Sequence, residues 1–599
     1  MTAHLLLVTL GPVQEFIAQA RRTRDLWYGS HLLSELGRAA ARALVDGGAK
    51  LIVPALSKGD PELVPCLAPR RASGTSPQNV ANKLLAEVPS GLGPEQLARD
   101  VREAVAQYWR EKVAAPVKAN CAGLIAPGID AVWDEQVDTF LEFTASWLPI
   151  DDYAATRRRL EQAIAGRKGL RDFDAWRHGR GSVPKSSLDG ARETVLRPPE
   201  DRDPKLASKY RIAKSEQLDA IGLIKRAGGE PDQFAPVVNV AIAAWVDLAS
   251  RVASNELENL RKACRAIGVS EVRRRDLPCV KPFPFDASVF LRSRWRAVFE
   301  EQGLGDDAER WGRQHVQPIL NEVSEPYPYV ACLVADGDHM GRVIDALGSA
   351  DDHRTLSAAL ARFAGEARKV VEQDYRGALV YAGGDDVLAF VPLRQAFSCA
   401  ESLRKRFVDE MRSACRPLAA EPPTLSIGLG VGHVMESMGD LLALGRQAER
   451  EAKRDRNSLA VIVDKRSGGA RPWRCIRPWR CMWSDDPVRA LCEATQLLKG
   501  HLSSRKVHEI ASTLARLPPP GEGHEGEWAR VLKLEVRRSL ARVEDGALSP
   551  ENAGLALDER ADYATVHADV RAWVDRMLIA RTFAEAEPRK RRRAEEAAA

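Results

Sequence analysis

The chain has 599 residues, of which 45% are hydrophobic and 29% charged, and its formal net charge is +5. This length is too great for one hydrophobic core and predicts roughly three to five domains. The composition is that of a soluble globular chain, no apolar run is long enough for a transmembrane helix, and the small net charge does not match a dedicated nucleic-acid binder.

The first residues predict a strand followed by a helix. The apolar run Leu5–Leu10 has no basic segment before it and is interrupted by Gly11 and Pro12, so it does not have the pattern of a signal peptide. Ten cysteines occur without a Cys-x-x-Cys pair, which suits a reducing compartment. We therefore expect a cytoplasmic protein.

The N-terminal part is predicted to form an α/β unit. A helix is expected from Gly11 to about Arg24, because proline is favoured in the first helical turn, and a second helix from Ser30 to Leu44. A short strand at Leu51–Ala55 follows, and then helical material over Gly93–Val113 and around Val137–Trp147. No pair of aspartates at a hairpin occurs here, so this unit is expected to lack metal ligands.

The stretch Tyr329–Lys465 has the order β-α-β-β-α-β, the split pattern of ferredoxin-like folds. Apolar spacing and turn residues predict its elements. They are strands at Tyr329–Ala335, Gly377–Ala382, Val387–Leu393, Leu425–Val434 and Leu459–Val463, and helices at Leu356–Val371, Arg394–Cys415 and Gly439–Lys453.

Three aspartates are expected to meet in this unit. Asp385 and Asp386 lie at the tip of the hairpin, and Asp336 follows the first strand. In the split topology the end of that strand lies beside the hairpin, and clustered carboxylates repel each other unless a cation such as Mg²⁺ binds them. Two-metal nucleotidyl transferases use this arrangement. A plain turn is the alternative, and the strand order favours the metal site.

The region after this unit is predicted to be mostly helical, over Pro487–Phe583. The repeated Arg-Pro-Trp-Arg-Cys segment within Arg471–Cys481 could stack on bases, although a packed structural loop is the favoured interpretation. The basic end, Arg589–Arg593, is expected to be a solvated tail, with RNA binding as the alternative.

Four segments in order resemble one known family. Gly11–Ile17, Asp25–Ser34, Ala335–Gly341 and the Gly-Gly-Asp-Asp turn at Gly383–Asp386 are similar to the large subunit of type III-B CRISPR effector complexes, the second Cmr subunit of the Cas-ten family. The similarity covers nearly the whole chain from Leu5. It implies an α+β multidomain protein with two ferredoxin-like palm domains and additional helical domains.

The same resemblance implies an activity and partners. In that family the palm with the Gly-Gly-Asp-Asp turn joins ATP into cyclic oligoadenylates when target RNA is bound, as part of antiviral defence. The expected partners are ATP, guide crRNA, target RNA and other Cmr subunits. Other nucleotidyl transfer on the same palm, or an RNA-binding scaffold without catalysis, remain as alternatives.

The resemblance also divides the chain into four predicted domains. They are a degenerate first palm at 1–180, a degenerate zinc module with a helical domain at 181–325, the second palm at 326–470, and a helical domain with a basic tail at 471–599. Many relatives begin with an HD nuclease domain, whereas this chain starts at the first palm strand, and its nearest candidate pair, His567 and Asp569, is expected to be surface polar. No HD nuclease activity is therefore expected.

The zinc module of the family is expected to be present without its metal. The family ligands, two Cys-x-x-Cys pairs, correspond here to Ser186, Asp189, Asp219 and Gly222. Zinc prefers thiolate and imidazole ligands, so no zinc is expected. Cys264 and Cys279 are expected to be buried apolar residues, and a pairing between the two is the alternative.

Residue roles follow from the motifs and the resemblance together. Asp336, Asp385 and Asp386 are the predicted catalytic residues and, with the carbonyl of Gly337, the ligands of two Mg²⁺ or Mn²⁺ ions. Asp338 is expected to face solvent, and backbone amides from Asp338 to Gly341 are expected to contact phosphate. The full predicted nucleotide-binding set is Gly337, Asp338, His339, Met340, Gly341, Gly383, Gly384 and Lys453.

Lys453 matches a phosphate-binding lysine of diguanylate cyclases, which these palms resemble. Those enzymes often read Ala-Lys-x-x-Gly-Arg-Asn, and this chain is one residue shorter, with Ala452-Lys453 followed closely by Arg456-Asn457. The alternative for Lys453 is a lysine that complements the dipole at a helix C-terminus.

Overall fold

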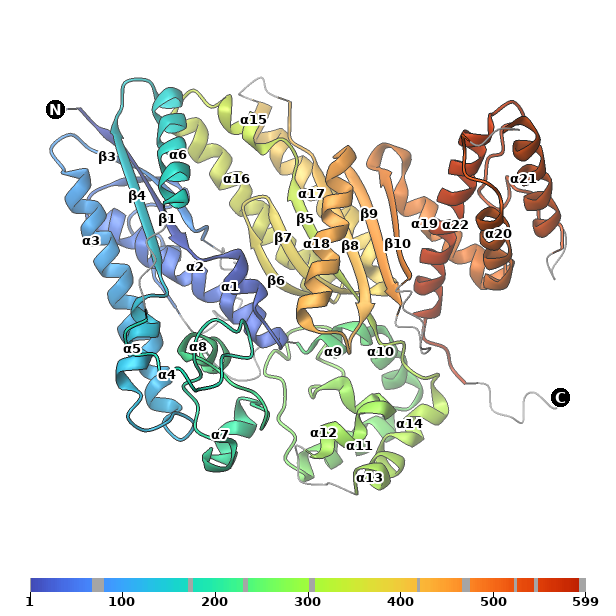
Figure 1. Cartoon of the computed structure of the whole chain (residues 1–599), viewed down its shortest axis with the longest axis horizontal. Coiled ribbons are helices and arrows are strands. Elements are labelled where there is room, and N and C mark those ends of the chain that lie inside the picture. Colours follow the sequence, from blue (N-terminus) through green and yellow to red (C-terminus); the bar gives the residue numbers. More distant parts are fainter. Residues whose placement is uncertain are drawn as a thin grey trace.

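The computed structural model describes residues 2–66, 80–170, 176–229, 235–300, 307–416, 421–465, 475–521, 525–542 and 548–591. Two β-sheets are flanked by helices, and a group of C-terminal helices lies at the end of the molecule opposite the first sheet (Figure 1). The predicted α+β multidomain class is confirmed. No helix among these residues is long and apolar enough to cross a membrane.

The first sheet is ferredoxin-like, with the strand order β2-β3-β1-β4 and antiparallel pairs throughout. Along β1 the side chains alternate between two cores. Leu6 and Val8 pack with α2 in one core, and Leu5 and Leu7 pack with α6 in another. The strands are β1 (His4–Gly11), β2 (Lys50–Val53), β3 (Lys83–Val88) and β4 (Glu142–Pro149), and the helices on them include α1 (Gln14–Ala18), α2 (Thr23–Asp46), α3 (Pro94–Gln107) and α6 (Tyr153–Gly169).

Two helix predictions in this unit are wrong. The two expected helices are present as α1 and α2, but the break between them lies before Thr23 and not between Arg24 and Ser30. The segment predicted as helical around Val137–Trp147 contains the end of α5 and the strand β4. Pairing with β1 provides the backbone hydrogen bonds of β4, and this long-range pairing overrides the local preference.

The second sheet repeats the same topology, and here the predicted β-α-β-β-α-β order is confirmed. Its strand order is β10-β9-β8-β5-β7-β6, and every neighbouring pair is antiparallel except β8 and β9, which are parallel. The strands are β5 (Tyr329–Gly337), β6 (Ala378–Gly383), β7 (Asp386–Pro392), β8 (Leu425–His433), β9 (Ser458–Lys465) and β10 (Cys475–Met482).

Different helices cover the two faces of this sheet. The helices α16 (Ala350–Lys369) and α17 (Leu393–Cys415) pack on one face with Leu333 of β5. On the other face, which shares a core with α2, lies α18 (Met438–Asp455). A Cβ atom at Gly430 would lie 2.4 Å from the backbone nitrogen of Gly445, so the two backbones approach very closely.

This close packing fixes where α18 ends. β8, α18 and β9 form a crossover between parallel strands, so the C-terminus of α18 returns to the edge where β8 begins and β5 ends. The residues that follow α18 therefore lie at the same edge as the hairpin tip.

Two further hydrophobic clusters lie in helical regions. The helices α4 (Ala115–Asn120) and α5 (Asp130–Asp138) lie between β3 and β4 in sequence. The helices between the two sheets in sequence include α7 (Pro204–Lys209), α8 (Ala220–Ala227), α9 (Val237–Ala241), α10 (Ala243–Val252), α11 (Ser254–Ala266), α12 (Trp295–Glu300), α13 (Ala308–His315) and α14 (Gln317–Glu322). The C-terminal ones are α19 (Pro487–Gly500), α20 (Ser504–Arg516), α21 (Glu525–Leu540) and α22 (Tyr563–Glu585).

Three of the four positions predicted to replace the zinc ligands take part in a helix cap, and Asp189 instead accepts a hydrogen bond from the amide of Ala191 at 2.9 Å. Asp219 precedes α8, and its Oδ1 accepts hydrogen bonds from the amide of Gly222 (2.8 Å) and the hydroxyl of Ser186 (3.1 Å). Cys264 and Cys279 are free thiols in different hydrophobic clusters, so they form no disulfide. The absence of zinc stays a prediction.

The basic end differs from the prediction in its first residues. Lys590 forms an isolated antiparallel bridge with Val323, and the amide of Arg591 donates to the carbonyl of Glu322 at 2.9 Å. Arg592 and Arg593 lie outside the described residues. In the Arg/Trp segment, residues 475–482 form the edge strand β10 by pairing with β9, so the loop favoured from the sequence is wrong. Trp479 is buried, which agrees with the expected packing of the tryptophans. Residues 471–474 lie outside the described part.

Candidate active site

Asp336, Asp385 and Asp386 meet at one edge of the second sheet. Asp336 is near the end of β5, Asp385 lies in the turn, and Asp386 begins β7. One carboxylate oxygen of each residue lies within 4.8 Å of the others. Within the described ranges, these three form the only such group of His, Cys, Asp or Glu side chains. The proximity expected from the strand order is therefore present.

Glycines make this close approach of the turn and the strand possible. A Cβ atom at Gly337 would lie 2.8 Å from both Cβ and Oδ2 of Asp385, so any other residue there would displace that carboxylate. Gly384 has a φ of +66° with open space around it, whereas Gly383 lies against the Tyr381 ring, whose hydroxyl donates to its carbonyl at 3.2 Å. A nucleotide was expected to approach the backbone at both glycines, but only Gly384 has open space beside it.

The electrostatics of the cluster suit a cation. Burial and the negative charge of Asp336 raise the pKa of Asp385 to about 6. Reduced access to water, a hydrogen bond with Asp336 and the charge of Asp385 raise the pKa of Asp386 further. A bound cation would relieve this repulsion. Carboxylate and carbonyl oxygens are the donors that Mg²⁺ and Mn²⁺ prefer, so the residues present fit such an ion.

Lys453, at the end of α18, is in direct contact with this cluster. Its Nζ forms a close ion pair with Oδ2 of Asp336 and donates to the Gly337 carbonyl at 2.7 Å. It also lies 3.2 Å from Oδ1 of Asp338. Burial disfavours the charged lysine, but the contacts with Asp336 and Asp338 outweigh this effect and raise its pKa.

The expectation that Asp338 faces solvent is wrong. Its side chain is fully buried, and its carboxylate accepts hydrogen bonds from the hydroxyls of Thr424 (2.8 Å) and Ser426 (2.9 Å) and from the amide of Asn457 (2.9 Å). Its own amide donates to the Thr424 carbonyl at 2.7 Å, so that amide is not free to bind phosphate. Asp338 instead joins β5, the start of β8 and the turn after α18.

Sequence reasoning missed Thr424, Ser426 and Asn457. A signal was present, because two hydroxyl residues spaced two apart at the start of a strand point to the same face. Both hydroxyls face the same carboxylate, and recognising them required knowledge that β8 pairs with β5.

The remaining predicted residues lie around the start of α15 (Met340–Asp345). Met340 is buried, and Gly341 has open space where a side chain would be. His339 has a φ of +59°, and its ring lies 3.0 Å from Nη1 of Arg456. Arg456 and Asn457 also have positive φ, and such a backbone conformation costs a residue other than glycine about 1–3 kcal/mol of free energy. Strained backbone therefore concentrates beside the carboxylates.

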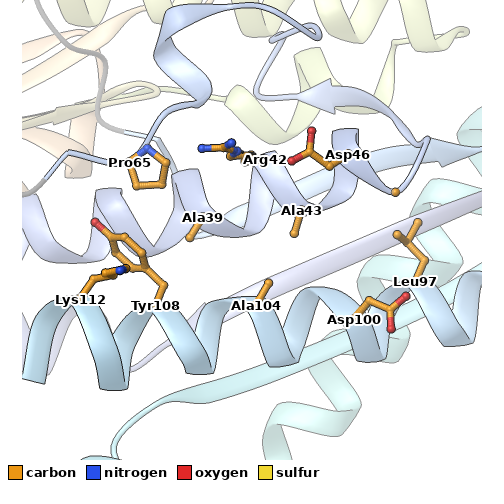
Figure 2. Close-up of a pocket in the computed structure, with 11 residues that line it drawn as sticks. Ala39, Arg42, Ala43, Asp46, Pro65, Leu97, Asp100, Ala104, Tyr108 and Lys112 are labelled. Carbon is orange, nitrogen blue, oxygen red and sulfur yellow. Dashed lines mark hydrogen bonds and ion pairs between the residues drawn. The ribbon is translucent and has the colours of Figure 1, made fainter. Parts of the chain in front are cut away.

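A separate cavity of about 790 Å³ lies between α2 and α3 of the first sheet's unit. Figure 2 shows its alanines, Ala39, Ala43 and Ala104, with the charged side chains of Arg42 and Asp100 nearby. None of its lining residues belongs to the carboxylate cluster, so it is not the site described above.

Comparisons with known proteins agree with this geometry. Residues 329–460 match the family model described as Cas10/Cmr2, second palm domain, and residues 5–114 match that of CRISPR-associated protein Cmr2, N-terminal. Over these two segments the chain is similar to the Cas10/Cmr2 proteins. The resemblance inferred from the four sequence segments is thereby confirmed, and the carboxylate cluster lies within the segment that matches the second palm domain.

Individual Cas10/Cmr2 relatives extend over most of the chain. The protein described as CRISPR system Cmr subunit Cmr2 of Pyrococcus furiosus is 24% identical over 90% of this chain and 69% of its own length. Two solved structures of Type III-B Cmr-beta share the fold at 12% identity. The apo state has a TM-score of 0.63 and covers 97% of this chain and 82% of that one. The state bound to cognate target RNA has a TM-score of 0.64, with 97% and 83% covered.

Proposed function

We propose that this chain is the large subunit of a type III-B CRISPR effector complex and that its second palm joins ATP into cyclic oligoadenylates when target RNA is bound. The observation that carries the proposal is the cluster of Asp336, Asp385 and Asp386 at the edge of a Cas10/Cmr2 palm sheet. Clustered carboxylates with raised pKa values are unfavourable in a protein that only serves as a scaffold, and they are typical of sites that bind catalytic cations.

In the proposed reaction, a 2′- or 3′-hydroxyl of one ATP attacks the α-phosphorus of another. A new oxygen–phosphorus bond forms, the bond to the β-phosphate oxygen breaks, pyrophosphate leaves, and the proton of the hydroxyl is released. Bound Mg²⁺ or Mn²⁺ would supply charge stabilisation for the attacking and leaving oxygens.

The chain's own residues have three roles in this reaction. Asp336, Asp385, Asp386 and the Gly337 carbonyl hold the cations. Lys453 adds positive charge beside the phosphates, and the open backbone at Gly384 leaves room for a nucleotide. Backbone groups from His339 to Gly341 lie at the same edge of the sheet as the carboxylates. The amide of Asp338 is not available to the nucleotide, because it donates to the Thr424 carbonyl.

The proposed partners are guide crRNA, target RNA and other Cmr subunits. The support is the likeness in fold to Type III-B Cmr-beta, one of whose structures is bound to cognate target RNA. If the proposed cations and RNA partners are correct, the activity should depend on both a divalent cation and RNA.

The test uses the full complex reconstituted with guide RNA and partner subunits. Labelled ATP is supplied with Mg²⁺ or Mn²⁺, with and without complementary target RNA, and mass spectrometry identifies the products. We expect cyclic oligoadenylates only with target RNA. Products that require a second small molecule would indicate different nucleotidyl transfer, and no turnover with either metal would contradict an enzymatic role.

A further inference from the structure

We propose that Lys453 is an internal cation that occupies the oxygens of the metal site in the metal-free protein and moves aside when a divalent cation binds. Asp338 then keeps the displaced ammonium close to the site. This inference rests on the proposed metal site, but it does not depend on which nucleotide reaction the palm performs.

The geometry shows that the lysine and a metal would use the same oxygens. Nζ of Lys453 contacts Oδ2 of Asp336 and lies 2.7 Å from the Gly337 carbonyl. These are two of the oxygens assigned to the cation. An ammonium group and a divalent ion repel each other at such distances, so both cannot hold the same pair of oxygens.

The packing of α18 on the sheet determines the position of Lys453. α18 lies against β8 and β5 through glycines, with Gly445 so close that a Cβ atom there would lie 2.7 Å from Sγ of Cys332. The end of the helix is therefore fixed, and only the flexible lysine side chain is free to move.

Asp338 provides the second position for the ammonium. Its buried carboxylate is held by Thr424, Ser426 and Asn457, and Lys453, at 3.2 Å, is the cation paired with it. A buried carboxylate without a cation is strongly unfavourable, so Lys453 is expected to keep this contact after it leaves Asp336. Asp338 is therefore a positioning residue, which acts through Lys453.

The exchange has a consequence for metal affinity. A cation must displace Lys453 from Asp336 and Gly337, so the lysine weakens metal binding in the resting protein. Removing the ammonium should tighten metal binding and at the same time slow the reaction, because the positive charge beside the phosphates is lost.

The test measures Mn²⁺ binding to the full-length protein without nucleotide, from the electron paramagnetic resonance signal of free Mn²⁺. We expect Lys453→Met to bind Mn²⁺ about three- to tenfold more tightly than the unchanged protein. The control is Arg454→Met, which removes a positive charge from the next position of the same helix, where the side chain is exposed and pairs with Glu451. Unchanged or weaker binding by Lys453→Met would overturn the proposal, as would equal tightening by the control.

A second measurement needs no variant and is independent of folding defects. The rate of acetylation of Lys453 is followed by mass spectrometry with and without Mn²⁺. We expect the rate to rise several-fold with Mn²⁺, because the ammonium leaves two of its three partners, and an unchanged rate would contradict the exchange. Complete absence of Mn²⁺ binding in the unchanged protein would instead count against the metal site itself.

Discussion

The two sheets of this protein share one strand order and differ in what their strand ends carry. β2-β3-β1-β4 and β6-β7-β5-β8 follow the same ferredoxin-like sequence of neighbours. In the second sheet a tight turn joins β6 and β7 and places Asp385 beside Asp336. In the first sheet residues 54–82 separate β2 from β3, and β1 ends in Leu10 and Gly11 instead of a carboxylate.

This difference shows that the shared strand order alone does not create an active site. In both units the first strand lies between the third and the fourth, but the chemistry depends on the residues at the strand ends. The expectation of a degenerate first palm is consistent with the sequence of its strand ends, and it stays a prediction.

The largest expected effect comes from removing the carboxylates of the turn. The double change Asp385→Asn and Asp386→Asn should lower product formation at least about 100-fold, because the cation ligands are lost, without loss of assembly. The measurement is cyclic oligoadenylate formed by the reconstituted complex, with Asp409→Asn, an exposed aspartate on α17, as control. Failure of the double variant to fold or assemble would argue against a purely catalytic role.

A smaller effect is expected from closing the space between strand and turn. Gly337→Ala should reduce the rate about tenfold, because the new Cβ atom collides with Asp385, with little change in melting temperature. The matched control is Gly11→Ala at the end of β1, where the nearest atom is Oε2 of Glu142 at 3.0 Å, a side chain on an exposed edge that can move. Equal loss of activity in both variants would show that the effect is not specific to the second sheet.

The smallest effect concerns a carboxylate outside both sheets. Burial raises the pKa of Asp219 to about 6, so between about pH 4 and pH 6 the folded state binds more protons than the unfolded state, and stability falls as the pH rises. Asp219→Asn keeps the cap on α8 and removes the buried charge. It should be about 1–2 kcal/mol more stable than the unchanged protein at pH 8.

Thermal unfolding at pH 4 and pH 8 checks this prediction, and the difference between the two proteins should vanish toward pH 4. A variant that is less stable at pH 8 would mean that the charge of Asp219 has a partner in the native protein.

Elemental analysis tests the related expectation about the zinc module. Purified protein should contain no stoichiometric zinc, because Ser186 and Asp219 engage each other and the helix cap and offer neither thiolate nor imidazole. One zinc per chain would contradict that expectation.

The sequence by itself determined five of the six strands of the second sheet, all except the edge strand β10, and its carboxylates. The signals for these elements are local: short apolar runs, helical spacing of apolar residues, a glycine-rich turn and an aspartate at the end of a strand. The strand order that they imply is compatible with few topologies. The positions of Asp336, Asp385 and Asp386 followed from these signals alone.

Only the tertiary structure decided the surroundings of those carboxylates. β4 was mistaken for a helix because its partner β1 lies far away in sequence, and Asp338 was placed in solvent because Thr424 and Ser426 reach it only through strand pairing. The contact of Lys453 with Asp336 depends on how closely α18 packs on β8. These side-chain contacts join residues that are 86 or more positions apart, and local patterns carry no information on which distant groups will satisfy a buried charge.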